Sequence, residues 1–301
     1  MHDPAARDHD ARFRRVLDYI DRHLDEPLDV ERLSRVAAFS KFHFHRQFAL
    51  RFGVGVHRYV QLVRLTRASH RLAFRQRESI MQIALASGYE APEAFARAFR
   101  KDSGQSPSAF REAPRWDAWH AASQVISQIR STHMTPVHTD DAVRIVDFPE
   151  TRVACLVHRG DPRLVGESIR RFIDWRKLNR LPPAASRTFV VAWNDPETVA
   201  PADYRLDLCA ATAREIADNA FGVSPATLPG GRCAWLRHTG SDATLRASVA
   251  WLYRQWLPAS GYETRDAPLF FERVRFFPDV AEHEAVTDIF LPLGAHTPAH
   301  G

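Results

Sequence analysis

The first 115 residues are predicted to be helical throughout. Apolar residues recur every three or four positions, and polar caps and glycines mark where one helix gives way to the next. The predicted helices cover about residues 13–26, 30–37, 41–52 and 56–74. The second and third helices are short, begin after the N-cap residues Asp29 and Ser40, and are separated by a tight turn. That arrangement is typical of a helix-turn-helix.

The same pattern recurs about 50 residues later. Short helices are predicted over residues 80–86 and 91–103, with Gly88 in the turn between them. Leu33 aligns with Ile83, and Phe48 with Phe99. This internal duplication predicts an all-α double helix-turn-helix whose second helices are candidates for the major groove. The helix between them would be about 28 Å long, close to the roughly 34 Å between successive major grooves on one face of B-DNA.

Charge is unevenly distributed along the chain. The net charge is +5, but residues 1–115 hold 21 Lys and Arg against 14 Asp and Glu, whereas the remaining residues hold 20 against 22. Residues 32–77 carry eleven basic side chains and not one acidic one. Such a surface favours a polyanion, since each contact to a phosphate releases counterions. An Arg-rich surface that only faces water is the alternative interpretation.

Three segments of the first half carry a specific resemblance. They are residues 39–48 (FSKFHFHRQF), 83–99 (IALASGYEAPEAFARAF) and 104–111 (GQSPSAFR). Over about residues 12–111 the chain resembles the AraC/XylS family of bacterial transcription regulators. The turn residue is Gly88 in the second unit but Ala38 in the first, and this departure is expected to strain the first turn slightly.

The resemblance implies which side chains contact DNA. They are Ser40, Lys41, Phe42, His45 and Arg46 in the first unit and Pro92, Glu93, Ala94, Ala96 and Arg97 in the second. Arg46 and Arg97 are the strongest candidates for base contacts, because a guanidinium can donate two hydrogen bonds to guanine. A contact to phosphate alone is the alternative for each of them. The phenylalanines at positions 44, 48, 95 and 99 are expected in the core instead.

The second half is predicted to be an α+β domain. Residues 116–139 are expected to form a linker that begins with a helix-prone stretch, which separates domains over residues 1–115 and 140–296. Beyond it, seven predicted strands alternate with helices near residues 164–178 and 243–256. Ala154, Leu156 and His158 recur 80 residues later, so we predict a strand-helix-strand-strand module used twice.

The second half is similar to the GyrI-like effector-binding domains, over about residues 141–293. The segments that carry this resemblance are WNDP at 193–196, YRLD at 204–207, LFFER at 269–273 and TDIFLP at 287–292. In that family a glutamate at the position of Glu272 lies at the bottom of an aromatic cleft and attracts cationic or amphipathic ligands. By analogy, Trp193, Trp235 and Tyr204 would form the aromatic walls. A pair between Glu272 and an internal arginine such as Arg205 is the alternative.

We therefore expect a transcription regulator that binds double-stranded DNA and senses a small, cationic or amphipathic effector. RNA polymerase is a further expected partner, as for an activator, although the direction of regulation does not follow from the sequence. No catalytic residues, metal site or cofactor are expected. The alternative is a small-molecule hydrolase or drug-sequestering module, in which Glu272 would act with His158 or His238.

Composition excludes other classes of protein. No apolar run approaches the roughly 18 residues of a membrane span, and the N-terminus has no signal-peptide pattern, so a cytoplasmic location is expected. Cys155, Cys209 and Cys233 lie far apart without metal-ligand spacing. We interpret them as small apolar residues, and a repair methyltransferase that needs an activated cysteine is not expected.

Overall fold

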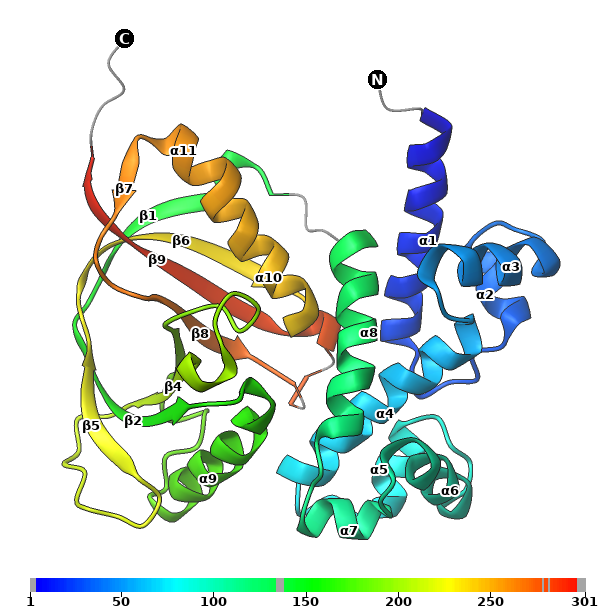
Figure 1. The fold of residues 1–301 in the computed structure, drawn as a ribbon, viewed down its shortest axis with the longest axis horizontal. Coiled ribbons are helices and arrows are strands. Elements are labelled where there is room, and N and C mark those ends of the chain that lie inside the picture. Colours follow the sequence, from blue (N-terminus) through cyan, green and yellow to red (C-terminus); the bar gives the residue numbers. More distant parts are fainter. Residues whose placement is uncertain (1–3, 134–137, 278, 281, 297–301) are drawn as a thin grey trace. The chain divides into compact units, whose positions relative to one another are not determined.

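The chain forms two compact units in a computed structural model (Figure 1). The structure describes residues 4–133, 138–277, 279–280 and 282–296. The division between the units falls between residues 135 and 136, and residues 241–244 and 282–283 group with the first unit.

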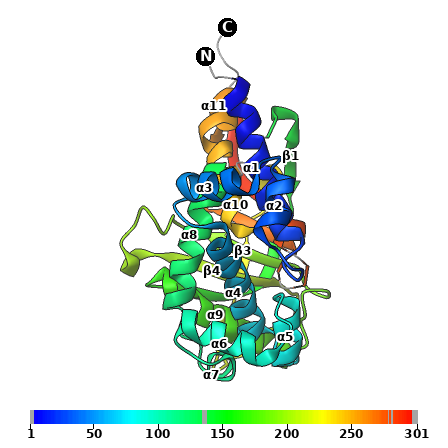
Figure 2. The ribbon, with the colours of Figure 1, turned by 90° about the vertical axis from the view of Figure 1, so that its right-hand side faces the viewer.

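The first unit is a bundle of helices. Its helices are α1 (Pro4–Arg22), α2 (Val30–Val36), α3 (Lys41–Phe52), α4 (Val56–Phe74), α5 (Ile80–Ala86), α6 (Pro92–Ser103), α7 (Pro107–Glu112) and α8 (Asp117–His133). Figures 1 and 2 both show α4 between the pair α2 and α3 and the pair α5 and α6. The duplicated helix-turn-helix predicted from the sequence is confirmed.

Local capping explains where these helices begin. The side chain of Asp29 accepts a hydrogen bond from the backbone N–H of Arg32 at 2.7 Å, and Ser79 forms a capping box with Gln82. The apolar faces then pack inward. The phenylalanines predicted to be core residues at positions 44, 48, 95 and 99 are all buried.

Most of the segment predicted to be a linker, residues 116–139, is helical. This helix is α8, and Ala122, Ile126 and Ile129 on one face of α8 are buried in the same core as α1, α3 and α4. Trp116, just before α8, is buried in the core around α5 and α6. Residues 117–133 therefore belong to the helical unit and are not a linker.

The second unit is built on one antiparallel sheet. Its strands are β1 (Val143–Phe148), β2 (Thr151–Arg159), β3 (Thr188–Ala192), β4 (Arg205–Ala211), β5 (Val223–Leu228), β6 (Gly231–Thr239), β7 (Tyr262–Thr264), β8 (Leu269–Arg275) and β9 (Val286–His296). The strand order is β1-β6-β9-β8-β3-β4-β2-β5, and β7 pairs with β9. Helices α9 (Val165–Leu178), α10 (Asp242–Trp251) and α11 (Leu257–Ser260) complete the α+β unit.

The duplication in this unit is longer than predicted. The pair β1 and β2 recurs as β5 and β6, followed by α10, β8 and β9 in place of α9, β3 and β4. The repeated module is therefore strand-strand-helix-strand-strand. Strands β5 and β7 were not predicted from the sequence.

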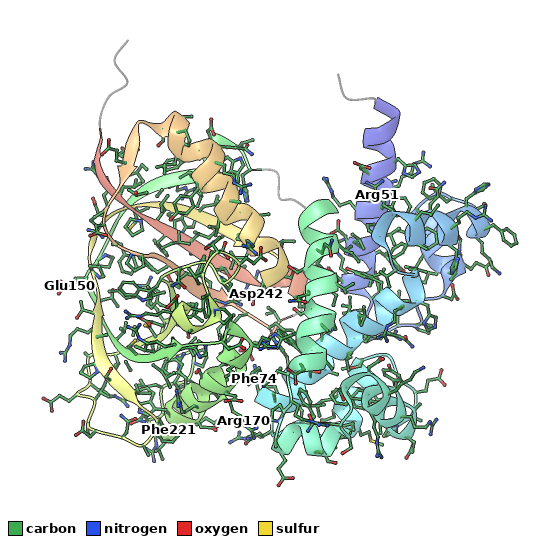
Figure 3. All side chains as sticks on the ribbon, in the orientation of Figure 1. Arg51, Phe74, Glu150, Arg170, Phe221 and Asp242 are labelled. Carbon is green, nitrogen blue, oxygen red and sulfur yellow. The ribbon has the colours of Figure 1, made fainter. Side chains whose placement is uncertain are left out.

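The two repeats pair with each other through the first two strands of each. Phe148 pairs with Gly231 and Thr151 with Leu228, so the register of β1 with β6 continues into that of β2 with β5. The two bends lie so close that a Cβ on Gly230 would stand 2.7 Å from the backbone nitrogen of Glu150, which Figure 3 labels. Only glycine fits at position 230 without moving this backbone.

One face of the sheet is covered by helices and the other is aromatic. Alternate residues such as Leu156 and Leu236 pack against α9 and α10. The residues between them form a second core around Phe148, Phe189, Phe270 and Phe290, and we call this side the aromatic face. The ring centroids of Phe148 on β1 and Phe189 on β3 are 5.9 Å apart, although β3 is four strands away from β1 in the sheet. The sheet therefore curves strongly around this face.

Buried histidines fasten both helices to the sheet. His158 on β2 is hydrogen-bonded to Ser168 on α9 at 2.9 Å, and His238 on β6 to Ser248 on α10 at 2.8 Å. Ser248 is also hydrogen-bonded to His138, again at 2.8 Å. These pairs recur at the 80-residue spacing of the duplication, which explains why the sequence repeats His158 as His238.

Ser248→Ala is expected to lower the free energy of unfolding by about 1–3 kcal/mol, because the buried His238 and the half-buried His138 each lose a hydrogen bond to this serine. Ser168→Ala is the matched control, since Ser168 serves one histidine, and its loss should be smaller. Urea denaturation followed by far-UV circular dichroism measures both. Equal losses in the two variants would show that the contact with His138 adds nothing.

Candidate DNA-binding and effector-binding sites

Helix α3 presents a row of exposed side chains. Ser40 caps its first turn and accepts a hydrogen bond from the backbone N–H of His43. The predicted contact residues Lys41, Phe42, His45 and Arg46 are all exposed, and Phe42 is 84% exposed. The neighbours Phe44 and Phe48 are buried, so the helix exposes one face and packs the other. Phe42 therefore adds apolar surface to the exposed face of α3.

Helix α6 repeats this presentation. Pro92 stands at its start, Glu93 and Arg97 are exposed, and Ala94 and Ala96 are half-buried. Arg97 lies 51 residues after Arg46, the same spacing that relates Phe99 to Phe48. The two arginines therefore occupy the same position in the two repeats. Within the described part of the chain, neither guanidinium has a hydrogen bond or an ion pair.

The long basic segment is less available for a polyanion than its composition indicates. Carboxylates from outside the segment pair with several of its arginines. The pairs are Arg32 with Glu26, Arg51 with Asp10, Arg58 with Asp102, and Arg71 with Glu78. By contrast, Lys41 and Arg46 on α3 have no partner among the described residues. Lys41 and Arg46 on α3 are therefore among the cations of this segment that remain free to meet an anion.

Arg64 on α4 connects the two helix-turn-helix repeats, because it binds the loop before α2 and lies against the turn between α5 and α6. Its Nε donates to the carbonyl of Leu24 at 3.0 Å and its Nη2 to the carbonyl of Glu26 at 2.7 Å. Burial lowers the pKa of this guanidinium. Gly88 lies directly against it, with a positive φ of 71°. The equivalent residue Ala38 also has a positive φ, 53°, which confirms that the first turn uses a strained alanine.

The second candidate site lies on the aromatic face of the sheet. Trp193, Trp235 and Glu272 belong to this side, as expected from strand alternation. Trp193 is 46% exposed and donates from its indole N–H to Asp207 at 2.7 Å. Tyr204 is not with them: it is buried, and its ring lies 5.9 Å from His158 on the helix-covered side.

Glu272 is paired with Arg187, an arginine that the sequence pattern does not indicate. Nε and Nη2 of Arg187 donate to the two carboxylate oxygens at 2.7 and 2.6 Å. The predicted alternative partner, Arg205, instead forms the same two-point pair with Asp207. Arg237 forms a third such pair, with Asp288. These hydrogen bonds raise the pKa of all three guanidinium groups.

Sequence signals for these arginines exist but are short. Arg205 lies two residues before Asp207, and Arg237 lies two residues after Trp235, so each shares a strand face with its neighbour. Arg187 precedes β3 and carries no such local mark. Its pairing follows only from the register, which places Glu272 opposite Phe189.

The hydrolase constellation is not assembled. Glu272 lies on the aromatic face, whereas His158 and His238 lie on the helix-covered face and are hydrogen-bonded to serines there. The three cysteines are buried, and Cys155 faces Cys209 across β2 and β4. A hydrogen bond between these thiols lowers the pKa of Cys155 and raises that of Cys209. The described residues contain no cluster of three His, Cys, Asp or Glu side chains suited to a metal.

None of the helices in the described part of the chain combines the length and the apolar character needed to cross a bilayer.

Comparison with known proteins places both halves of the chain. Residues 141–293 match a GyrI-like small molecule binding domain, and residues 33–113 match a helix-turn-helix domain. The probable transcriptional regulator YgiV of Escherichia coli (strain K12) is 43% identical over 152 residues, which are 50% of this chain and 95% of that protein. The right origin-binding protein of the same organism is 32% identical over 107 residues, 36% of this chain and 37% of that protein.

A solved structure also resembles the first unit. The DNA-binding domain of AdpA, a global transcriptional factor in complex with a target DNA, is 31% identical and covers 33% of this chain and 87% of its own, with a TM-score of 0.31. The chain joins a DNA-binding double helix-turn-helix of the AraC type to a small-molecule binding domain. It therefore belongs to the GyrI-like family, as a transcription regulator with an AraC-type helix-turn-helix.

Proposed function

We propose that this regulator reads two adjacent major grooves with α3 and α6 and that a small molecule on the aromatic face controls this binding. The proposal extends the family assignment to particular residues. We further propose Ser40, Lys41, Phe42, His45 and Arg46, together with Pro92, Glu93, Ala94, Ala96 and Arg97, as the DNA-contacting set.

The equivalence of Arg46 and Arg97 is the observation that carries the proposal. Both side chains are exposed, both are free of partners among the described residues, and both stand two residues before a buried phenylalanine. A guanidinium without an internal partner can turn its paired N–H donors toward guanine O6 and N7. Two equivalent DNA-contacting helices, α3 and α6, on one chain allow a monomer to contact two half-sites.

Selection of random duplex DNA by the purified full-length protein at physiological salt tests the proposal. We expect enrichment of two short motifs about one helical turn apart. Failure to enrich any motif, with binding that disappears as salt rises, would indicate only a basic surface and would overturn sequence-specific recognition.

Arg46→Ala and Arg97→Ala are each expected to relax the preference at two or three base pairs and to weaken binding to the selected site by about 1–3 kcal/mol. Each variant should affect a different half of the motif. Arg254→Ala, an exposed arginine of the second unit, is the control and should leave the motif unchanged. Uniformly weaker binding with an unchanged motif would assign the residue to phosphate contact instead.

We propose that the second unit, over residues 140–296, binds its ligand without turning it over. The separation of Glu272 from His158 and His238 on opposite faces of the sheet supports this, because a general base and its partner must lie within hydrogen-bond reach. Trp193, Trp235 and Glu272 are the ligand-contacting candidates, and Tyr204, predicted with them, is better explained as a core residue. RNA polymerase is a further proposed partner.

Control by the ligand requires different ligand affinities in the DNA-bound and free states. Measuring ligand affinity with and without the selected operator tests this directly. Equal affinities would favour a module that only sequesters its ligand. Loss of the ligand over time, with appearance of a product, would favour the hydrolase.

A further inference from the structure

We propose that the aromatic face binds an organic anion, a carboxylate or sulfonate carried on an apolar body, and not a cation. This inference rests on the proposed ligand binding of the second unit and adds the chemical class of the ligand. It follows from how the charges of this face are already engaged.

On the described strands of the aromatic face, each carboxylate is already paired with an arginine. Asp207, Glu272 and Asp288 each accept two hydrogen bonds from one arginine, at 2.6–3.0 Å. Their side chains are only 7%, 15% and 8% exposed, respectively. A cationic ligand would have to displace a guanidinium from a nearly buried carboxylate, which removes a bidentate, charge-assisted pair.

The aromatic rings are occupied in the same way. The guanidinium of Arg205 lies 3.9 Å from the ring centroid of Trp193. Trp235 has two such neighbours, Arg144 at 5.5 Å and Arg237 at 5.3 Å. Because an arginine already lies over each indole, these rings offer a second cation less attraction than a bare ring would.

The arginines nevertheless keep donors for an anion. In all three pairs the carboxylate is bound through Nε and Nη2, on one edge of the guanidinium. Nη1 of Arg187, Arg205 and Arg237 donates to no described residue. The side chains of Arg187 and Arg237 are about half exposed, at 47% and 50%, so their free edges are accessible.

Arg144 gives the aromatic face a positive charge that no described carboxylate neutralises. It is exposed on β1, lies over Trp235, and has neither a hydrogen bond nor an ion pair with any described residue. With it and Arg159, which stands opposite Arg205 in the register, the arginines on the described strands of this face outnumber the three carboxylates. A ligand anion can therefore neutralise Arg144 without breaking an existing pair, and the exposed Trp193 offers apolar surface to the rest of the ligand.

A matched series of ligands tests the charge. 1-Naphthaleneacetate, 1-naphthylmethylammonium and 1-naphthalenemethanol share one ring system and differ in charge, and titration calorimetry on the full-length protein measures their affinities. We expect the order acetate, alcohol, ammonium from strongest to weakest. Arg144→Gln should weaken the acetate about tenfold and leave the alcohol nearly unchanged. Arg254→Gln, which removes an exposed arginine from the segment packed on the other face, should change neither.

Glu272→Gln separates the two ligand classes further. If the ligand is anionic, this variant frees Arg187 and removes a negative charge, so the acetate should bind about threefold more tightly or better. Tighter binding of the ammonium compound by the unaltered protein, and its loss in Glu272→Gln, would overturn the proposal while leaving ligand binding intact. If calorimetry detects binding of none of the three compounds to a protein that still selects its DNA motif, the result would instead count against the aromatic face as a ligand site.

Discussion

Gly88→Ala is expected to lower the free energy of unfolding of the helical unit by about 3 kcal/mol or more. A Cβ at this position would stand 2.6 Å from Cζ of Arg64 and 2.8 Å from the carbonyl oxygen of Leu24. Arg64 cannot move aside without releasing the carbonyls of Leu24 and Glu26 that it binds. The positive φ of 71° adds the cost of placing a Cβ in the left-handed region.

Ala38→Gly is the matched experiment in the other repeat. Ala38 already has a φ of 53°, so glycine relieves that strain. The gain of about 1–2 kcal/mol is partly offset by the greater freedom of glycine in the unfolded chain, about 0.5–1 kcal/mol. We expect a variant that is as stable as the original protein or slightly more stable.

Chemical denaturation of the full-length variants, with hydrogen exchange read on peptides of residues 4–130, assigns both effects to the helical unit. The prediction rests on opposite outcomes at two equivalent positions. A small loss in Gly88→Ala would mean that Arg64 relocates without cost and does not fix the second turn. A large loss in Ala38→Gly would mean that its Cβ, and not its backbone, matters.

The helical unit follows closely from its sequence because its signals are local. Asp29, Ser40 and Ser79 each cap the helix predicted to follow them, and Gly53 and Gly104 follow the last residues of α3 and α6. These caps depend on residues three or four apart, so no knowledge of the tertiary fold is needed. The exposure of Arg46 and Arg97 follows from the same periodicity.

Helix α8 could be predicted as a helix but not as part of the core. Its buried residues Ala122, Ile126 and Ile129 have helical spacing. Polar residues and alanine surround this narrow apolar stripe, which makes it a weak signal. What places α8 in the unit is its packing against α1, α3 and α4, which is information from distant parts of the chain.

Strand β5 and the arginine partner of Glu272 do not follow from the sequence, for physical reasons. Strand β5 contains Pro225, which argues against a central strand, but β5 lies at the end of the strand order, where a missing N–H is tolerated. The partner of Glu272 was missed because Arg187 is 85 residues away in sequence. The strand face of Glu272 is predictable from alternation, but its neutralisation depends on which strands pair.

Arg130→Met is expected to be the most destabilising single change in the helical unit, by about 3–5 kcal/mol. Arg130 on α8 is 1% exposed, forms an ion pair with the buried Asp21 on α1, and donates from Nε to the hydroxyl of Tyr59 at 3.4 Å. Methionine preserves the apolar length of the side chain but leaves a buried carboxylate without its cation. Thermal and urea unfolding of the full-length protein, with hydrogen exchange of α1 and α8, measures the loss.

The loss should also depend on pH. Burial raises the pKa of Asp21 to about 6. Because this pKa lies above the ordinary value, the contribution of Asp21 to stability is most favourable below about pH 4 and falls as the pH rises through 6. In Arg130→Met the pKa rises further, so the carboxyl is neutral at pH 5 and the variant loses less there than at pH 8.

The double variant Asp21→Leu with Arg130→Met decides between a paired charge and simple packing. Removing both buried charged groups leaves only Glu282, whose side chain is 20% exposed and pairs with Arg130 at 2.9 Å, without its cation. The double variant should therefore recover most of the stability lost in Arg130→Met alone. A double variant as unstable as the sum of the two single changes would contradict this account. In that case α8 would be held to the helical unit by the stem of Arg130 and by Ile126 and Ile129, with the ion pair contributing little.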